Sequence, residues 1–301
     1  MSLTLRPSTV QPSLTDILWL VGYPALLAAV AMLATRPWRR GRDLAGWGAA
    51  VAIAGGFAIA FYHVFGGMPP FPPSLAQQWL LFLGVPVIVV AIVQPFVKSR
   101  AIAVAASALV LGVTPWLLLR NVTFLEPRIL WTWMVAAALA MIAWWAAMES
   151  LARRARGASL PLLLGIVVAV SGLAIINSHS ATMGQAAGSV AIPLIVVSFA
   201  ALWPRGASLA RGGMLAMTML LLGLLLFAHL FLDMPARDAA LLAVAPLAVW
   251  AGELPGLGKA DSWKRLGVRM VAVLAVLALP ATSAINGLKG TLDEQYESYS
   301  Y

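Results

Sequence analysis

The feature that most constrains this chain is a series of apolar runs, each about twenty residues long and separated by short polar loops. The runs are rich in Leu, Ala and Val, and apolar and polar residues do not alternate within them. A helix of about twenty residues crosses the hydrocarbon core of a bilayer, whereas a barrel strand needs about ten alternating residues. Only 10% of the residues are charged, against roughly a quarter in a soluble domain. These observations predict an all-α protein that crosses a membrane many times.

The apolar runs predict a polytopic transmembrane helical bundle of about ten spans. These spans form a single transmembrane domain over residues 14–286. Residues 1–13 precede it as an N-terminal segment, and the polar tail 287–301 is expected to be disordered. The predicted spans are Leu14–Thr35, Leu44–Phe65, Leu75–Val97, Ala101–Leu119, Ile129–Glu149, Ala158–Asn177, Ala181–Trp203, Gly212–Leu232, Met234–Leu254 and Met270–Asn286.

The basic residues predict how the spans are oriented. Fifteen of the 20 Lys and Arg follow odd-numbered spans, and only five lie in the other connections and terminal segments. Loops that carry an excess of Lys and Arg stay in the cytoplasm. We therefore expect both termini to be extracytoplasmic and the protein to be integral to a bacterial cytoplasmic (inner) membrane.

The same charge distribution excludes some classes of function and partner. The formal net charge is +9, but the cations are spread over many short loops and form no single basic face for nucleic acid. The chain has no Cys, which excludes disulfides and Cys-based metal sites. Phosphate-binding Gly-rich loops and nucleophile elbows are also missing from the sequence. We expect membrane lipids as partners, together with partner membrane helices or a second copy of the chain, and we expect no nucleic acid and no cofactor.

Three histidines are the strongest candidates for chemistry. On the predicted topology, His63, His179 and His229 all lie toward the outer side. Asp233 follows His229 by four residues, so the two could share a helix face. Imidazoles with a carboxylate could bind zinc or act as a general base. The sequence has no established metal spacing, and each His also suits a purely structural role at the membrane interface.

A second candidate is the polar, small-residue stretch that joins the sixth and seventh spans, residues 177–189. Ser180, Gly184 and Gly188 recur every four residues, a spacing that places them on one helix face. Small residues allow membrane helices to approach closely. Together with Gln185, these residues predict either a helix-packing seam or the wall of a substrate path.

Five segments spread over most of the chain form a recognisable set. They are His63 with Pro69–Pro73 and Trp79, Thr114–Arg120, Trp144–Glu149, Ser180–Gly188, and Leu232–Pro235 through Gly252. Together these segments resemble a family of uncharacterised multi-pass proteins that is associated with planctomycete bacteria. This resemblance implies a ten-helix membrane protein and brings with it no activity, substrate or cofactor.

Three hypotheses about function follow from the sequence. The leading one is a non-catalytic membrane protein, either a transporter or channel-like carrier or a subunit of a membrane complex. A carrier predicts a path lined by Thr114, Ser171, Asn177 and Gln185. The second hypothesis is a membrane-embedded enzyme with an extracytoplasmic His/Asp site. The third is a structural or assembly factor that docks a partner helix on the Gly184 face.

Overall fold

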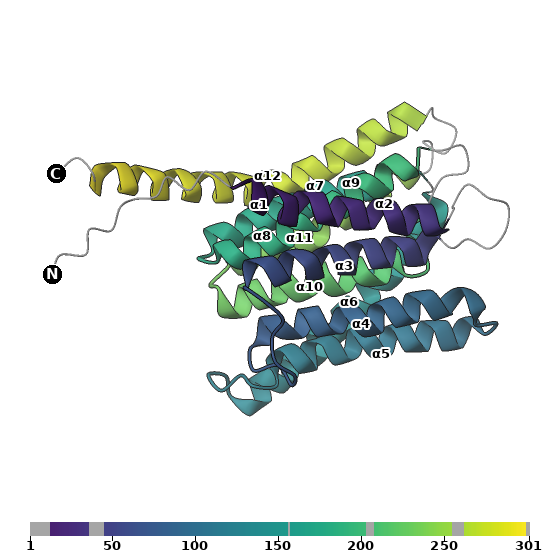
Figure 1. Ribbon diagram of the computed structural model, residues 1–301, viewed down its shortest axis with the longest axis horizontal. Helices are drawn as coiled ribbons and strands as arrows, with labels where there is room; N and C mark the ends of the chain where they lie inside the picture. The colour runs from purple at the N-terminus through teal and green to yellow at the C-terminus, as the bar shows by residue number, and fades with distance from the viewer. Residues whose placement is uncertain (1–12, 36–44, 156, 203–207, 255–261, 299–301) are drawn as a thin grey trace.

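A computed structural model of the chain describes residues 13–35, 45–155, 157–202, 208–254 and 262–298. Every regular element in these ranges is a helix, and the helices run side by side along the long axis of the molecule (Figure 1). In chain order they are α1 (Leu14–Ile17), the π-helix η1 (Leu18–Gly22), α2 (Tyr23–Thr35), α3 (Ala45–Val64), α4 (Ala76–Val93), the 3-10 helix η2 (Gln94–Phe96), α5 (Arg100–Leu119), α6 (Pro127–Arg154), α7 (Ser159–Asn177), α8 (Ala181–Ser189), α9 (Ala191–Ala200), α10 (Gly213–Phe231), α11 (Ala236–Val244), the 3-10 helix η3 (Ala245–Glu253) and α12 (Ser262–Ser298).

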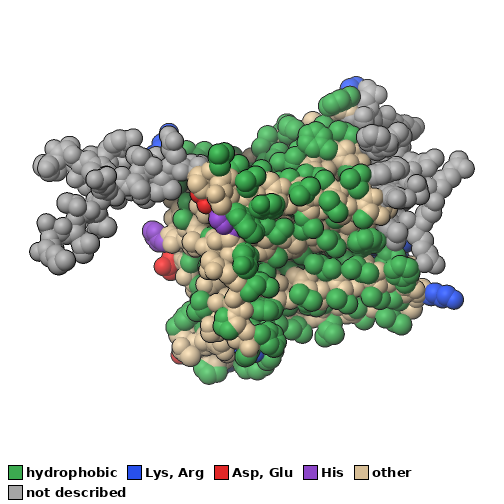
Figure 2. All heavy atoms as spheres, in the orientation of Figure 1, with side chains coloured by type: hydrophobic (Ala, Val, Ile, Leu, Met, Phe, Trp, Pro, Cys, Tyr) green, Lys and Arg blue, Asp and Glu red, His purple; other side chains and the backbone are tan. Residues whose placement is uncertain are grey.

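Nine helical segments in the described part of the chain are long and apolar enough to cross a membrane. They correspond to the predicted spans one to eight and ten, and the first has the predicted bounds Leu14–Thr35. Side chains on the lateral surface in Figure 2 are mostly hydrophobic, as contact with lipid requires. The all-α, multi-pass architecture is therefore confirmed. The orientation of the termini across the membrane stays a prediction.

The predicted ninth span differs from an unbroken α-helix. It consists of α11 followed directly by η3, and Pro246 lies in the first turn of η3. In a 3-10 helix the N–H of residue 246 would bond to the carbonyl of Ala243, but proline has no N–H. The indole Nε1–H of Trp144 in α6 donates to that carbonyl instead, at 2.7 Å. A side chain of a neighbouring helix thus satisfies the backbone group that the proline leaves open.

The segment α11–η3 nevertheless runs from one end of the bundle to the other. Next to its start, His229 at the end of α10 contacts the carbonyl of Met234. At its far end, Glu253 forms an ion pair with Arg269 near the start of α12. A nine-residue α-helix and a nine-residue 3-10 helix have a combined rise of about 30 Å, close to the thickness of the hydrocarbon core.

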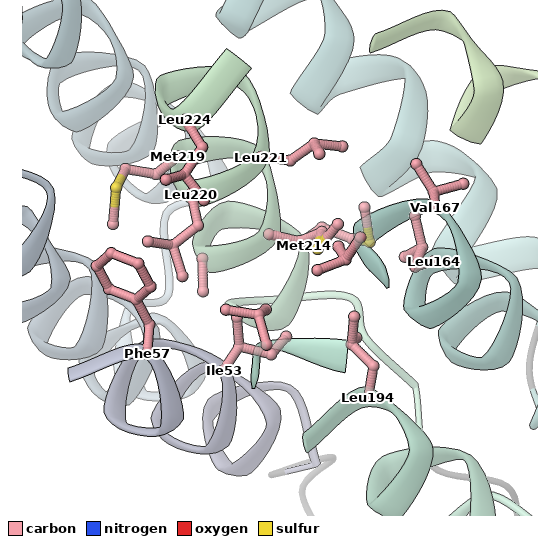
Figure 3. Packing of buried hydrophobic residues seen from close by; sticks show 14 of the residues in the cluster. Ile53, Phe57, Leu164, Val167, Leu194, Met214, Met219, Leu220, Leu221 and Leu224 are labelled. Carbon is pink, nitrogen blue, oxygen red and sulfur yellow. The ribbon is translucent and has the colours of Figure 1, made fainter. Parts of the chain in front are cut away.

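The core of the bundle is built around α10, which is apolar on all sides and almost completely buried. A helix of this composition belongs in the centre of a bundle, because every face needs an apolar neighbour. Figure 3 shows Ile53 of α3, Leu164 of α7 and Leu194 of α9 converging on Met214 and Leu220 of α10. The middle of the described bundle is consequently filled with hydrophobic side chains.

The C-terminal region differs from the prediction. The tenth span was expected to end at Asn286, with a disordered tail over 287–301. Instead α12 continues without interruption to Ser298, and residues 299–301 lie outside the described part. Its 37 residues correspond to about 55 Å of helix, so α12 projects well beyond the other helices at one end (Figure 1). Most of the expected N-terminal segment, residues 1–12, also lies outside the described residues.

Candidate functional site

The three histidines lie at or just after the ends of α3, α7 and α10, which are at the same end of the bundle (Figure 1). His63 in the last turn of α3 contacts Asp16 of α1, with its Nε2 2.9 Å from the carboxylate Oδ1. Its ring also stacks on Trp19 of η1, with 5.5 Å between ring centroids. Asp16 additionally forms a capping box with Ser13. The contact between His63 and Asp16 joins α1 and η1 to α3, and sequence reasoning missed it because the two residues are 47 positions apart.

His229 and Asp233 do not form the predicted pair. The Nδ1–H of His229 donates to the carbonyl of Met234 at 2.8 Å, and its ring packs on Trp133 of α6. Asp233 is exposed and has a left-handed backbone conformation, with φ at 54°. Because the chain turns at Asp233 and α11 begins only at Ala236, the two side chains do not share a helix face.

His179 is exposed in the turn between α7 and α8, also with a left-handed backbone, φ 69°. Among the described residues, no group of three or more His, Cys, Asp or Glu side chains could hold a metal ion. The three metal-site candidates His63, His179 and His229 therefore do not come together in the described part of the chain. Each of these side chains has its own surroundings at the same end of the bundle.

The small-residue seam lies inside the protein, between α7 and α8. A Cβ added at Gly184 would lie 2.7 Å from the carbonyl oxygen of Gly172, and one added at Gly172 would lie 2.8 Å from the amide nitrogen of Gly188. Backbone thus meets backbone across the two helices. Ser180 is the N-cap of α8, and its hydroxyl accepts a hydrogen bond from the N–H of Met183. The face around Gly184 is occupied by a helix of the same chain, and the sequence-based prediction missed its counterpart, Gly172.

The residues expected to line a path have other roles. The hydroxyls of Thr114 and Ser171 are buried, and each donates to a carbonyl one turn earlier in its own helix, at 2.9 Å. Gln185 is exposed on the surface of α8. Asn177 is close to α12, because a Cβ added at Gly287 would lie 1.8 Å from its Oδ1. These four residues do not converge on a common cavity among those found in the described part of the chain.

The opposite end of the bundle contains a polar recess of about 180 Å³, which we call the basic recess. Four cationic side chains line it, those of Lys98, Arg100, Arg153 and Arg211. Lys98 lies in the tight connection between η2 and α5, and Arg100 is the first residue of α5. Arg153 belongs to the last turn of α6, and Arg211 immediately precedes α10. Elements far apart in the sequence therefore place their cations around one recess.

One face of α6 builds the wall of the basic recess. Trp145, Glu149 and Arg153 are spaced four residues apart, so they lie one above another on the same side of the helix. Glu149 is only 5% exposed, and its Oε1 accepts hydrogen bonds from Arg153 Nε and Nη2 at 3.1 and 2.9 Å. A buried carboxylate requires such a partner, because an unpaired buried charge is strongly unfavourable.

Glu149 also holds the turn that carries Arg211. The backbone N–H of Arg211 lies 3.0 and 3.2 Å from the two carboxylate oxygens of Glu149. Arg211 has a left-handed backbone, φ 59°, which costs energy for a non-glycine residue. The hydroxyl of Ser208 ties the same connection to α6 through the carbonyl of Ala152, at 2.9 Å. This arrangement fixes the backbone of the turn while leaving the guanidinium of Arg211 exposed.

The basic recess therefore contains donors that the protein does not use. Within the described residues, the side chains of Lys98, Arg100 and Arg211 form no hydrogen bond or ion pair. Trp145 is only 5% exposed, and its indole N–H is buried without an acceptor. A buried donor that lacks an acceptor costs about 1–3 kcal/mol. This indole N–H lies beneath the wall of the recess, so the donors that a ligand can reach are those of the three cations.

A second cluster of cations lies near the start of α12 and has a structural role. Arg269 is 6% exposed and is held by Glu253 of η3 and by the hydroxyl of Ser159, the latter at 2.7 Å from its Nη1. Its side chain passes over Gly252, where an added Cβ would lie 2.4 Å from Nε. Arg154 lies over the ring of Trp250. These contacts fasten the end of η3 to α6, α7 and α12.

Comparisons with known protein families, with curated proteins and with solved structures find no match for this chain. The resemblance to multi-pass proteins of planctomycete bacteria thus stays a prediction. What the fold and composition establish is the class, a multi-pass helical membrane protein.

Proposed function

We propose that this protein binds an anionic membrane ligand in the basic recess and acts as a lipid-binding subunit of a membrane assembly. The observation that carries the proposal is the unused donor set around one small recess. Lys98, Arg100 and Arg211 line the recess, and the only carboxylate among the lining residues, that of Glu149, is already paired with Arg153. Basic pockets between membrane helices are established binding sites for anionic headgroups.

The predicted topology supports a site of this kind. If α11–η3 completes a tenth crossing, the basic recess faces the cytoplasm, both termini lie outside, and the membrane is the bacterial inner membrane. The cytoplasmic leaflet carries anionic lipids, and each Lys or Arg near its surface adds about 1 kcal/mol of attraction. The functional site would then lie at the end of the bundle that contains the basic recess, and not at the end that contains the histidines.

This proposal favours the subunit hypothesis over a carrier for a physical reason. Carriers of known type place their sites near the membrane midplane, at breaks in their helices. Here the break before Pro246 is closed by the indole of Trp144, and the middle of α10 contacts hydrophobic side chains. The donors that could hold a ligand are instead gathered at one membrane surface.

The test is a lipid preference that depends on the basic recess. The full-length protein would be placed in nanodiscs of phosphatidylcholine with a minor share of phosphatidylglycerol, and the co-purifying lipids measured by native mass spectrometry. We expect enrichment of phosphatidylglycerol that weakens with added salt, because exposed charges are screened. The double variant Lys98→Gln/Arg100→Gln should lose this enrichment.

The matched control is the double variant Arg128→Gln/Lys289→Gln. It removes the same charge from exposed positions at the histidine end of the bundle. Equal enrichment around the wild type and the Lys98/Arg100 variant, or equal loss in both double variants, would contradict a specific site and leave only general electrostatic attraction.

A further inference from the structure

We infer that the ligand of the basic recess carries a terminal phosphate, a phosphomonoester group, on a membrane lipid. This inference rests on the proposed function and names the chemical class of the ligand. Three independent properties of the recess support it, namely its charge, its size and the surface onto which it opens.

The positive charge of the recess favours a dianion over a monoanion. Four cations and one carboxylate leave a formal charge of +3. Arg153 and the Glu149 carboxylate compensate each other, so Lys98, Arg100 and Arg211 remain. A phosphomonoester carries about −1.5 to −2 at neutral pH and has three acceptor oxygens, whereas a phosphodiester carries a single negative charge. Glu149 does not repel the phosphate strongly, because Arg153 and the Arg211 backbone N–H engage it.

The size of the recess favours a small headgroup. Its volume of about 180 Å³ lies below the roughly 300–1,000 Å³ of typical small-molecule pockets. A bare phosphate fits this space better than a phosphate that also bears a bulky polyol.

The surroundings of the recess favour a lipid over a soluble phosphate. Val97 and Val104 line the recess beside the cations, and Val104 is 40% exposed. The neighbouring Ile102 is 61% exposed on the lipid-facing surface of α5. An acyl chain attached to the phosphate could therefore continue along α5. The recess is also next to the start of α5, where the helix dipole is positive.

The experiment compares three probes on the full-length protein in detergent at neutral pH. They are short-chain phosphatidate, short-chain phosphatidylglycerol and inorganic phosphate. We expect phosphatidate to bind about tenfold more tightly than phosphatidylglycerol, as one additional charge-assisted hydrogen bond would provide. Arg211→Gln removes one of the three uncompensated cations, while Glu149 still holds the turn through the backbone N–H of residue 211. This variant should therefore weaken phosphatidate binding by about tenfold and leave the melting temperature near that of the wild type.

The outcomes separate the inference from the proposed function. If phosphatidate and phosphatidylglycerol bind equally well and Lys98→Gln/Arg100→Gln loses both, the inference of a phosphomonoester is wrong. The proposed function, binding of an anionic lipid, would then still stand. Binding of both lipids that is unchanged in that variant would overturn both proposals. If inorganic phosphate competes at the same concentrations as phosphatidate, the lipid part of the inference is wrong and a soluble phosphomonoester is the ligand. Weak competition by phosphate supports the lipid.

Discussion

Two glycines of α8 should respond in opposite ways to the same substitution. At Gly184, an added Cβ would lie 2.3 Å from Ile176 Cγ1, 2.7 Å from the Gly172 carbonyl oxygen and 2.8 Å from the Ile176 amide nitrogen. Carbon atoms in contact are normally about 3.5–4.0 Å apart, so α7 and α8 would have to separate. At Gly188 nothing lies within 4 Å of an added Cβ.

The expected magnitude follows from comparing Gly184→Ala with Gly188→Ala. Replacing a helical Gly by Ala stabilises the helix by up to about 1 kcal/mol, and this gain is common to both variants. Only Gly184→Ala adds the cost of overpacking, about 1–3 kcal/mol. The difference in unfolding free energy between the variants should therefore be about 1–3 kcal/mol, with Gly184→Ala the less stable.

Thermal unfolding in detergent, followed by tryptophan fluorescence, measures this difference. Each kcal/mol corresponds to about 2–4 °C in Tm for chains of comparable size. We expect Gly188→Ala to unfold at or above the wild-type temperature and Gly184→Ala several degrees below it. Equal Tm values for the two variants would refute the close backbone approach of α7 and α8. Such a result would instead favour the hypothesis that the Gly184 face of α8 docks a partner helix.

Three further outcomes can be checked by the same unfolding assay. Trp144→Phe leaves the Ala243 carbonyl without its donor and should cost about 1 kcal/mol. Trp145→Phe breaks no hydrogen bond and removes an unsatisfied donor, so it should lower Tm less than Trp144→Phe; the reverse order would contradict the two assignments. Gly252→Ala should cost about 1–3 kcal/mol because the Cβ meets the clamped side chain of Arg269. Gly252→Ala should cost less when it is introduced into the Arg269→Met variant than into the wild type. The same cost in both would argue against a clash between the added Cβ and Arg269. His63→Gln should lower Tm only slightly, because the contact between His63 and Asp16 is partly exposed. A decrease in Tm as large as that of Gly184→Ala would show that this contact contributes more to stability than expected.

Sequence reasoning and structure agree best where a single local property decides the outcome. The first span has the predicted bounds because apolar length and the Ser13–Asp16 capping box are both local features. The ninth span departs from the prediction at Pro246, where a 3-10 helix replaces the α-helix. Hydropathy does not distinguish these two helices, and the indole that stabilises the break comes from residue 144.

The candidate sites show even more clearly that local features can be predicted from sequence and contacts between distant residues cannot. The common side of the three histidines follows from counting spans, but their partners do not. His63 contacts an acid 47 positions earlier, and His229 contacts the turn that follows it. From the sequence alone, the cations of the basic recess predict only how the spans are oriented across the membrane. The spacing of Trp145, Glu149 and Arg153 was the one local sign that they share a helix face.

The residue pattern along the chain is enough to establish a multi-pass helical bundle, because each helix must satisfy its own backbone within lipid. It also placed most of the spans and separated a basic end from a histidine end. Which side chains meet follows from the packing of the helices in three dimensions. It placed Gly184 against Gly172, left the predicted zinc ligands in separate surroundings, and grouped Lys98, Arg100 and Arg211 near the indole of Trp145. The physical reason is that hydropathy specifies burial along one helix, whereas a site needs the relative rotation and depth of several helices, which their packing sets.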